Sequence, residues 1–394
     1  MAKVVMSGNS AQAYAARLAR VEVVAAYPIT PQTTIIEKLA EFLAKGELAA
    51  QYIKVESEHS AMAACIAASA VGARTYTATS SQGLLLMHEL LHWAAGARAP
   101  VVMGVANRAV APPWNIGADH TDSVAQRDTG WIQLYAESNQ EVLDTVLQAF
   151  RLAEHAEVSL PAMVTEDAFF LTHTVEPVDV PSQAEVDAFL PPRRARFKLE
   201  AKGAMRVGSY MAADNFEEYR RKLALAMERV PAAFAEVERE YERATGRNHG
   251  GLLPLYKVEG ADAVLVTMGT ATTTARAVVD KLRSEGLRVG LAKLRSFRPF
   301  PQREVRALAK EVGTVGVLDR SFTFGPTGAA ATEVQAALYR APQRPGFAGF
   351  IGGLGGRDIT PQAVEGMFRR LLSGAASECE WVDLREAAEV RVGG

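Results

Sequence analysis

The sequence predicts an α/β protein with two units, each built on a mostly parallel sheet. Short β-prone runs alternate with helical patterns up to about residue 165, and the same alternation returns from Ala261. A proline-punctuated segment and a long charged stretch separate the two series. With 394 residues, 48% hydrophobic and 22% charged, the chain has the size and composition of a globular protein of two or three domains.

Charge and cysteine content exclude several classes of function. The formal net charge is −2, which gives no basic excess for nucleic acid. The two cysteines, Cys65 and Cys379, form no CxxC motif, so neither a disulfide scaffold nor a cluster held by this chain is expected. Cys65 is expected to pack in a core helix. No signal-peptide core and no run of 18 apolar residues is present. We therefore expect a cytoplasmic protein without a membrane segment.

The first unit opens with a strand over Ala2–Met6 and a helix capped by Ser7 or Asn9. A strand over Val23–Ala26 then runs into the loop YPITPQT, before a helix over residues 32–43. Prolines on both sides of Thr30 stiffen this loop and favour an extended Thr30, suited to present a hydroxyl to a substrate. Pro31 is equally suited to start the helix, and the two interpretations are compatible.

Two carboxylates follow the next strand, which we expect over Tyr52–Val55. Glu56 and Glu58 lie where this strand gives way to a helix of small and apolar residues, Ala61–Val71. Ligands of parallel sheets bind at the carboxyl ends of strands, and a carboxylate beside an apolar helix suits proton exchange. The alternative is a carboxylate that only stabilises the helix dipole.

A hydroxyl-rich turn stands at the end of the following strand. Residues 74–78 alternate and are β-prone, and Thr79–Gly83 (TSSQG) precede a helix expected over residues 84–95. The turn therefore lies at the same edge of the sheet as Glu58.

The strand predicted over residues 100–106 ends next to Arg108, a natural clamp for a carboxylate. The long loop that follows, APPWNIGADHTDSVAQRDTGW, has no clear periodicity, and such loops are usually functional. Its acidic and histidine side chains make a metal site conceivable, although their spacing fits no named motif and hydrogen bonding within the loop is the favoured interpretation: Asp119, His120, Asp122 and Asp128.

The rest of the chain predicts a linker region and the second unit. A helix over residues 140–156 and a strand over 161–165 complete the first unit. Residues 175–196 are expected to form an irregular wrap or linker, and residues 216–247 two helices broken near Pro231, with a solvated or docking face. The second unit is expected to contain these elements: strands at 263–270, 287–294, 314–319 and 347–351, and helices at 271–285, 302–311 and 361–372.

Short motifs for nucleotide or zinc binding are weak in this sequence. The glycines of GGLGGRDIT do not form a GxGxxG that opens a helix, and no Walker A lysine loop is present. Residues 88–92 (HELLH) match HExxH, but Ala95 and Arg98 stand where the extended zinc-protease pattern has glycine and histidine. A metalloprotease is therefore not favoured, and we predict no metal ligand in this chain.

The motifs together carry a resemblance to a known family. In order they are YPITPQT, VESEHSA, TATSSQG, ANRA…PPWNI…DHTDS…QRDTGW, RPFP and GGLGGRDIT. This series resembles the alpha subunit of the 2-oxoacid:ferredoxin oxidoreductases, most of all pyruvate:ferredoxin oxidoreductase, over essentially the whole chain. The resemblance implies a thiamine-diphosphate pyrimidine-binding domain with a helical appendage at residues 1–240, followed by a transketolase C-terminal-like α/β domain at residues 255–394.

The resemblance also assigns roles to residues. In this family the glutamate at the position of Glu58 contacts N1′ of the aminopyrimidine and stabilises its imino tautomer, whose 4′-nitrogen removes the proton from thiazolium C2. Arg108 would hold the carboxylate of the 2-oxoacid and Thr30 would hydrogen-bond it, which makes these three the expected catalytic residues. Asn115 would contribute to substrate binding. The resemblance further implies contacts with thiamine diphosphate from the following residues: Tyr27, Pro28, Ser81 and Gln82.

The resemblance implies half of an active site. Thiamine enzymes of this kind need a GDG…N element for Mg²⁺ and the diphosphate, and this sequence has none. A beta subunit would bring the diphosphate site, Mg²⁺ and a [4Fe-4S] cluster; gamma and delta subunits, ferredoxin and coenzyme A are further expected partners. Pyruvate is the favoured substrate, with oxalate, 2-oxoisovalerate and 2-oxoglutarate as alternatives. A transketolase-like transfer and a non-catalytic scaffold are the other classes considered.

Overall fold

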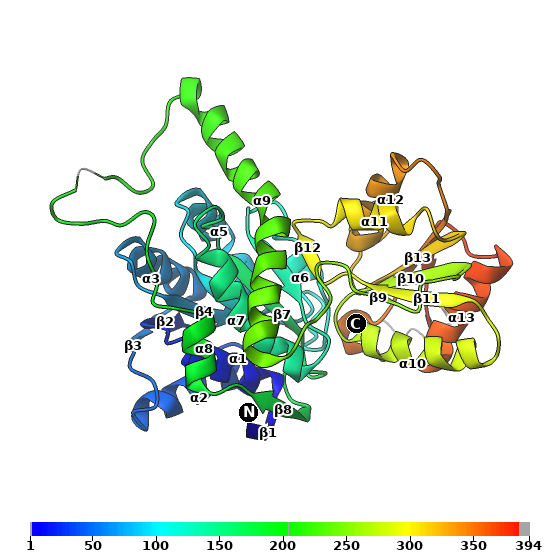
Figure 1. Cartoon of the computed structure of the whole chain (residues 1–394), viewed down its shortest axis with the longest axis horizontal. Helices are drawn as coiled ribbons and strands as arrows, with labels where there is room; N and C mark the ends of the chain where they lie inside the picture. Colours follow the sequence, from blue (N-terminus) through cyan, green and yellow to red (C-terminus); the bar gives the residue numbers. More distant parts are fainter. Residues whose placement is uncertain (1, 204, 386–394) are drawn as a thin grey trace.

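Two α/β units lie side by side in the computed structural model, which describes residues 2–203 and 205–385 (Figure 1). The first contains a seven-stranded sheet and the second a six-stranded sheet. This arrangement confirms the predicted fold class.

The first sheet has the order β12-β6-β7-β5-β4-β2-β3 and is parallel except for β12 at its edge. Its strands are β2 (Val23–Ala26), β3 (Gln51–Lys54), β4 (Thr75–Thr79), β5 (Val102–Asn107), β6 (Ile132–Tyr135), β7 (Ala162–Asp167) and β12 (Ser296–Arg298). Strand β12 comes from the second half of the chain and pairs antiparallel with β6. The second half of the chain therefore contributes the edge strand of the first sheet.

Helices cover both faces of this sheet because its strands are apolar on both sides. Val24 and Val102 face one hydrophobic core, whereas their neighbours Ala25 and Met103 face the other. The first core packs against α1 (Gly8–Leu18), α2 (Thr33–Ala44), α7 (Asn139–Ala153), α8 (Gln183–Phe189) and α9 (Ala213–Thr245). The second packs against α3 (Glu58–Ala70), α4 (Ser81–Leu86) and α5 (His88–Gly96).

The second sheet has the order β15-β14-β13-β10-β11-β9, parallel except for β9. Its strands are β9 (Leu255–Tyr256), β10 (Ala263–Thr267), β11 (Val289–Lys293), β13 (Thr314–Asp319), β14 (Gly346–Ile351) and β15 (Cys379–Trp381). Its helices are α10 (Ala271–Ser284), α11 (Gln302–Leu308), α12 (Ala329–Tyr339), α13 (Pro361–Ser373) and the short 3₁₀ helix η1 (Leu354–Gly356). Helices α11 and α12 pack in one core and α10 and α13 in the other.

The structure corrects two predictions between the units. Residues 175–189 are not irregular, because β8 (Val175–Val180) pairs antiparallel with β1 (Ala2–Ser7) and α8 follows, whereas residues 190–196 contain no helix or strand, as expected. Residues 216–247 are not two helices, because α9 continues through Pro231. Val230, Phe234 and other buried side chains on both sides of the proline pack into the first core, and this packing outweighs the local penalty of one missing N–H donor.

The structure also changes the elements around the TSSQG turn. A single helix was expected over residues 84–95, but α4 begins at Ser81 and a break at Met87 separates it from α5. Ser81 and Gln82 are therefore the first residues of a helix. The sequence prediction also missed β6, β12, β15, α12 and the short helix α6 (Thr121–Val124).

A buried ion network joins the units. The fully buried side chain of Arg295, between β11 and β12, lies 3.0 Å from Glu141 Oε1 and 2.5 Å from Glu238 Oε1. It also donates to Gln148 Oε1 at 2.7 Å, and Lys293 is paired with Glu141. Burial opposes ionisation of Glu141, but Lys293 and Arg295 outweigh it and lower its pKa to about 2. The network fixes the second unit against α7 and α9.

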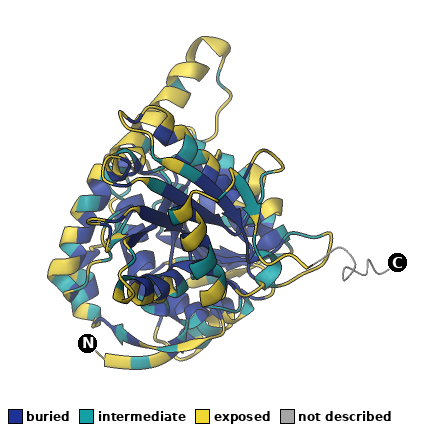
Figure 2. Cartoon of the chain, turned by 90° about the vertical axis from the view of Figure 1, so that its right-hand side faces the viewer, coloured by how far each residue is buried: buried dark blue, intermediate teal, exposed yellow. Residues whose placement is uncertain are grey.

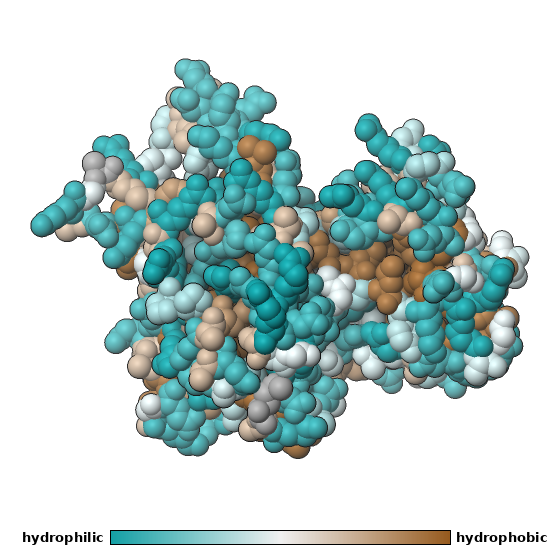
Figure 3. Space-filling view, viewed as in Figure 1, coloured by the Kyte–Doolittle hydropathy of each residue, from teal (hydrophilic) through white to brown (hydrophobic). Residues whose placement is uncertain are grey.

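The surface views agree with this layered organisation. Buried residues fill the sheets and the inner helix faces, and exposed residues cover the projecting start of α9 (Figure 2). Hydrophobic side chains also gather over the sheet of the second unit in the view of Figure 3. Among the described residues, none of the helices is long and apolar enough to cross a membrane.

Replacing Arg295 by methionine should destabilise the protein by about 3–5 kcal/mol, because two buried carboxylates lose a partner. The matched control is Arg288→Met, which removes a surface pair with Asp262 and should cost about 0–1 kcal/mol. Thermal unfolding of the purified proteins measures both changes. Equal unfolding midpoints for the two variants would contradict a structural role for the buried network.

Candidate active site

Four chain segments that carry the predicted site residues meet at one edge of the first sheet. They follow the carboxyl ends of β2, β3, β4 and β5, and these strands are neighbours in the sheet in the order β5-β4-β2-β3. The parallel pairing of the four strands brings their ends together. The edge therefore collects Thr30, Glu58, Gln82 and Arg108 from distant parts of the sequence.

Glu58 is the first residue of α3, where Ser57 caps the helix by accepting from Ser60 N at 3.2 Å. Its side chain is only 6% exposed. In the part of the chain that the structure describes, the Glu58 carboxylate has no hydrogen-bond or ion-pair partner. Glu56, two residues earlier, is exposed and instead holds Ser60 through a short hydrogen bond. Of the two carboxylates, Glu58 is thus the buried one without a partner among the described residues.

Gly83 in α4 leaves the space that the Glu58 carboxylate occupies. A Cβ at this position would lie 2.5 Å from Glu58 Oε1 and 2.5 Å from the hydroxyl oxygen of Thr79. The Thr79 hydroxyl is also buried and has no hydrogen-bond partner among the described residues. A buried carboxylate and a buried hydroxyl without partners are costly alone. These groups fit a polar ring that would supply the missing donor and acceptor, such as the aminopyrimidine of thiamine diphosphate.

Arg108 lies at the end of β5 and is 3% exposed. Its Nη1 donates to the carbonyl oxygen of Thr30 at 2.7 Å and its Nη2 to Gln82 Oε1 at 3.1 Å. The ring of Trp114 lies 5.5 Å from the guanidinium, while Trp114 itself is 76% exposed. Burial lowers the pKa of Arg108, and Asp122 opposes this effect. The side chain remains a cation at the site.

Asp122 joins the two segments that carry Gln82 and Arg108. Its Oδ2 accepts from Ser81 N at 2.9 Å and from Arg108 N at 3.1 Å, and its Oδ1 accepts from Asn107 Nδ2 at 2.7 Å. Ser81 has a positive φ of 48°, a conformation that a non-glycine residue adopts only when its surroundings hold it. Burial raises the pKa of Asp122 to about 6, although its hydrogen bonds offset part of that effect.

The YPITPQT loop is fixed to the sheet as predicted for a stiff loop. Gln32 Nε2 donates to Ala78 O at 2.6 Å, and Asn9 Nδ2 donates to Pro31 O at 2.7 Å. Tyr27, Pro28 and Thr30 are exposed at the sheet edge. Thr30 contacts Arg108 through its backbone carbonyl, and its hydroxyl has no partner among the described residues. The hydroxyl is therefore available to a bound molecule.

Among the described residues, Asn115 makes no hydrogen bond with Thr30, Gln82 or Arg108. Its Oδ1 accepts from Gly117 N at 2.6 Å, and a Cβ on Gly355 would lie 2.8 Å from its Nδ2. The loop that carries Asn115 contacts the GGLGG segment of the second unit, where Gly356 N donates to Ala118 O at 2.8 Å. The predicted contact of Asn115 with the substrate stays a prediction.

Asp119 and His120 are used in hydrogen bonds of the fold, whereas Asp128 is exposed and lies 3.9 Å from Arg127. Asp119 accepts from Thr121 N at 2.8 Å, and His120 Nε2 lies 2.7 Å from Asp167 Oδ1. The two histidines of HELLH stack edge to face with ring centroids 5.0 Å apart. No group of three or more His, Cys, Asp or Glu side chains within residues 2–203 and 205–385 is arranged to hold a metal ion.

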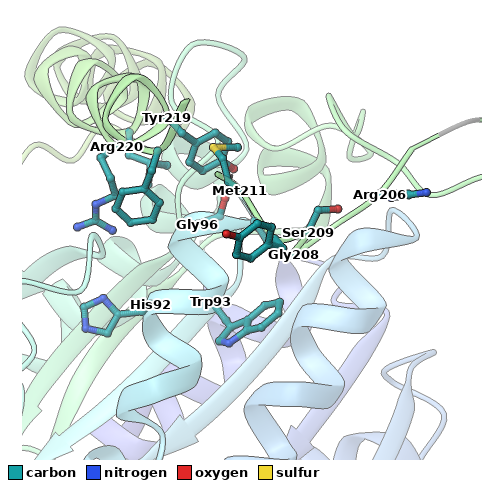
Figure 4. Close-up of a pocket in the computed structure, with 13 residues that line it drawn as sticks. His92, Trp93, Gly96, Arg206, Gly208, Ser209, Met211, Tyr219 and Arg220 are labelled. Carbon is teal, nitrogen blue, oxygen red and sulfur yellow. Dashed lines mark hydrogen bonds between the residues drawn. The ribbon is translucent and has the colours of Figure 1, made fainter. Parts of the chain in front are cut away.

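A cavity of about 570 Å³ lies beside α5, away from these residues. Figure 4 shows His92 and Trp93 of α5 on one side and Tyr219 and Arg220 of α9 on the other. The hydroxyl of Tyr219 makes a short hydrogen bond to the carbonyl oxygen of Gly96, which also lines the cavity. None of Thr30, Glu58, Gln82 or Arg108 lines this cavity.

Sequence reasoning missed Asp122 and Gly83 as site residues. Asp122 stood among other polar residues of an aperiodic loop, and its partners lie 14 and 41 residues away. Gly83 was treated as part of a turn, whereas its role depends on a carboxylate of another helix. A glycine in the first turn of a helix that packs on an acidic helix start is the signal that could have indicated it.

The comparisons with known proteins identify relatives over nearly the whole chain. Residues 14–239 match the family model "Pyruvate flavodoxin/ferredoxin oxidoreductase, thiamine diP-bdg", and residues 261–364 match "Pyruvate:ferredoxin oxidoreductase core domain II". The ketoisovalerate oxidoreductase subunit VorA of Pyrococcus abyssi is 51% identical over 97% of this chain and 98% of that protein. The pyruvate synthase subunit PorA of Methanothermobacter thermautotrophicus is 48% identical over 98% of this chain and 99% of that protein.

Two solved structures share the fold. A 2-oxoglutarate:ferredoxin oxidoreductase from Magnetococcus marinus has a TM-score of 0.72 and 19% identity, over 94% of this chain. This chain spans 65% of that chain's length. A split-gene transketolase has a TM-score of 0.51 and 13% identity, over 94% of this chain and 99% of that chain.

Gly83→Ala should lower activity of the assembled protein by roughly 100-fold, because the new methyl group displaces the Glu58 carboxylate. Stability should also fall by about 1–3 kcal/mol, because the Thr79 hydroxyl in the way belongs to a stiff β-branched side chain buried in β4. Gly366→Ala is the matched control, because nothing lies within 4 Å of a Cβ at that helix position. Wild-type turnover in Gly83→Ala would show that this space is not needed.

Activity should fall as pH drops through about 6, where Asp122 becomes protonated. A neutral carboxyl group is a weaker acceptor than a carboxylate, so its hydrogen bonds from the N–H groups of Ser81 and Arg108 weaken. Because the folded-state pKa lies above the usual value, this group favours folding at low pH, and its contribution is lost as pH rises through 6. Protonation of Asp122 therefore does not unfold the protein, and the loss of activity at low pH must have a cause other than unfolding.

A pH profile of Asp122→Asn tests this origin, since the variant should be weakly active without a step near pH 6. Asp319→Asn is the control, because burial also raises the pKa of Asp319 to about 6 but its carboxylate caps α12 in the second unit. If the pH profile of Asp122→Asn equals that of the wild type, Asp122 does not cause the loss of activity near pH 6.

Proposed function

The chain belongs to the pyruvate flavodoxin/ferredoxin oxidoreductase family, and from this membership we propose that it is the alpha subunit of a thiamine-diphosphate-dependent 2-oxoacid:ferredoxin oxidoreductase. The complex would decarboxylate a 2-oxoacid oxidatively, pass electrons to ferredoxin and transfer the acyl group to coenzyme A. Residues 1–240 would form the pyrimidine-binding domain and residues 255–394 the transketolase C-terminal-like domain.

The unpartnered carboxylate of Glu58 carries this proposal. Bound thiamine diphosphate would supply the electron sink for decarboxylation. Glu58 would hold the ring nitrogen of its aminopyrimidine and exchange a proton with it. Its nearly complete burial strengthens such a hydrogen bond. Thr79 adds a buried hydroxyl beside it, and the exposed Tyr27 and Pro28 offer a surface at the same edge.

Arg108 and Thr30 would bind the substrate. The guanidinium of Arg108 can donate two hydrogen bonds to a carboxylate, and the free hydroxyl of Thr30 would hydrogen-bond the same molecule.

In the described part of the chain no second lysine or arginine is hydrogen-bonded to Thr30 or Gln82. One cation suits a 2-oxoacid with one carboxylate, such as pyruvate or 2-oxoisovalerate, and pyruvate is our first choice. 2-Oxoisovalerate is the first alternative, and it is supported by the relatives named ketoisovalerate oxidoreductase. Oxalate and 2-oxoglutarate would need further positive charge from a partner.

The proposed site needs a partner chain. The sequence contains no GDG element and only two cysteines. A beta subunit would therefore bring the diphosphate site, Mg²⁺ and a [4Fe-4S] cluster, and Asn115 could meet substrate only in that assembly. Gamma and delta subunits, ferredoxin and coenzyme A would complete the system. The relatives bear the name of subunits, which supports assembly with other chains. The cytoplasmic location stays a prediction.

A 2-oxoacid panel on the co-purified complex tests this function. Dye reduction with pyruvate should exceed that with 2-oxoisovalerate, 2-oxoglutarate and oxalate, should depend on coenzyme A, and should fall at least about 100-fold in Glu58→Gln. Glu56→Gln is the matched control and should keep activity, because that carboxylate is exposed. Full activity of Glu58→Gln would instead favour a scaffold role for this chain.

A further inference from the structure

The guanidinium of Arg108 is held by neutral acceptors alone. Its partners are the carbonyl oxygen of Thr30 and the amide oxygen of Gln82. Asp122 contacts the backbone N–H of Arg108, and no carboxylate of the described residues lies within ion-pair distance of the guanidinium. A buried charge without an ion-pair partner is costly, so its retention points to an anion from outside the chain.

The side-chain amide of Gln82 is oriented by the contacts of its oxygen with Arg108 and Ser81. Gln82 Oε1 lies 3.1 Å from Arg108 Nη2 and 2.5 Å from the Ser81 hydroxyl, and that hydroxyl also lies 2.6 Å from Ala109 O. With the oxygen engaged, the Gln82 Nε2 group is left buried without a partner. Arg108 Nε is buried without a partner as well. Two side chains that are hydrogen-bonded to each other thus keep one free donor each.

This arrangement is rigid. Gln82 lies in the first turn of α4, directly after Ser81 with its positive φ. Asp122 Oδ2 fixes the backbone of both Ser81 and Arg108. The amide and the guanidinium are therefore positioned by the fold before any ligand arrives.

We propose that Gln82 is a specificity-determining and positioning residue for the 2-oxoacid: its amide oxygen orients the Arg108 guanidinium, and its free Nε2 is a second donor to the substrate carboxylate. This inference rests on the proposed function of Arg108 and replaces the expected contact of Gln82 with the cofactor. The neutral amide is essential, because a carboxylate at this position would pair with Arg108 and repel the substrate.

Steady-state kinetics of the assembled complex with pyruvate test this role in Gln82→Glu and Gln82→Met. Gln82→Glu should raise the KM for the 2-oxoacid by about 10- to 100-fold, the size expected for a hydrogen bond to a charged group. Its kcat and the concentration of thiamine diphosphate that gives half-maximal activation should stay within about twofold. Gln82→Met, which keeps the shape without hydrogen bonds, should raise the KM by a smaller factor because Arg108 keeps its charge.

Gln302→Glu is the matched control. Gln302 Oε1 also accepts from an arginine, Arg306 Nη2 at 3.3 Å, but on the exposed surface of the second unit. Its kinetics should equal wild type. The double variant Gln82→Met with Arg108→Lys should show less than the sum of the two single effects, because both side chains act on one carboxylate.

A rise in the thiamine diphosphate requirement of Gln82→Glu with an unchanged KM for the 2-oxoacid would overturn the inference and assign Gln82 to the cofactor. Equal losses in kcat for both variants with an unchanged KM would show a structural role only. Neither result depends on Glu58: if Glu58→Gln keeps full activity, the proposed function fails, whereas a failure confined to Gln82 leaves it intact.

Discussion

One buried carboxylate oxygen, Oδ2 of Asp122, connects the two segments that carry Gln82 and Arg108. It accepts from the backbone of Ser81 after β4 and of Arg108 after β5. These strands are neighbours in a parallel sheet, so their ends are close but carry no backbone pairing beyond the last ladder bond. Asp122 supplies that missing connection. The Ser81 hydroxyl, which donates to Ala109 O at 2.6 Å, adds a second connection between the same two strand ends.

The second constraint is the space above Gly83. Helix α3 places Glu58 at its start, and helix α4 comes close enough that only a glycine leaves room for the carboxylate. The acid is thus held by packing and by the helix start, without a partner of its own among the described residues. Glu141 and Asp144 are buried acids of another kind, because each is paired with a cation. The buried Glu166 also lacks a hydrogen-bond partner among the described residues and has a glycine, Gly8, that makes room for it, but it lies in β7 and not at a helix start.

The sequence predicted the local elements of the site well, because they depend on strong local signals. The strand ends before Thr30 and Arg108 follow from apolar runs, and the end before Glu58 follows from the helical pattern that begins there. The parallel sheet follows from the alternation of strands with helices. The predictions failed where distant contacts decide. Strand β12 pairs with β6 across the two units, and α9 passes through Pro231 because its neighbours are buried. The role of Asp122 depends on a partner 41 residues away. The family resemblance, once tested by the comparisons, supplied the chemistry that these patterns alone left open.

We propose that Glu58, whose carboxylate fills the space left by Gly83, binds the aminopyrimidine of thiamine diphosphate. A crystal structure of the assembled complex with the cofactor tests it most directly. The account predicts a carboxylate oxygen of Glu58 at about 2.6–3.0 Å from the ring nitrogen of the aminopyrimidine. A cofactor bound with that nitrogen facing another residue, and Glu58 left without a partner or paired with a side chain of the partner subunit, would contradict it.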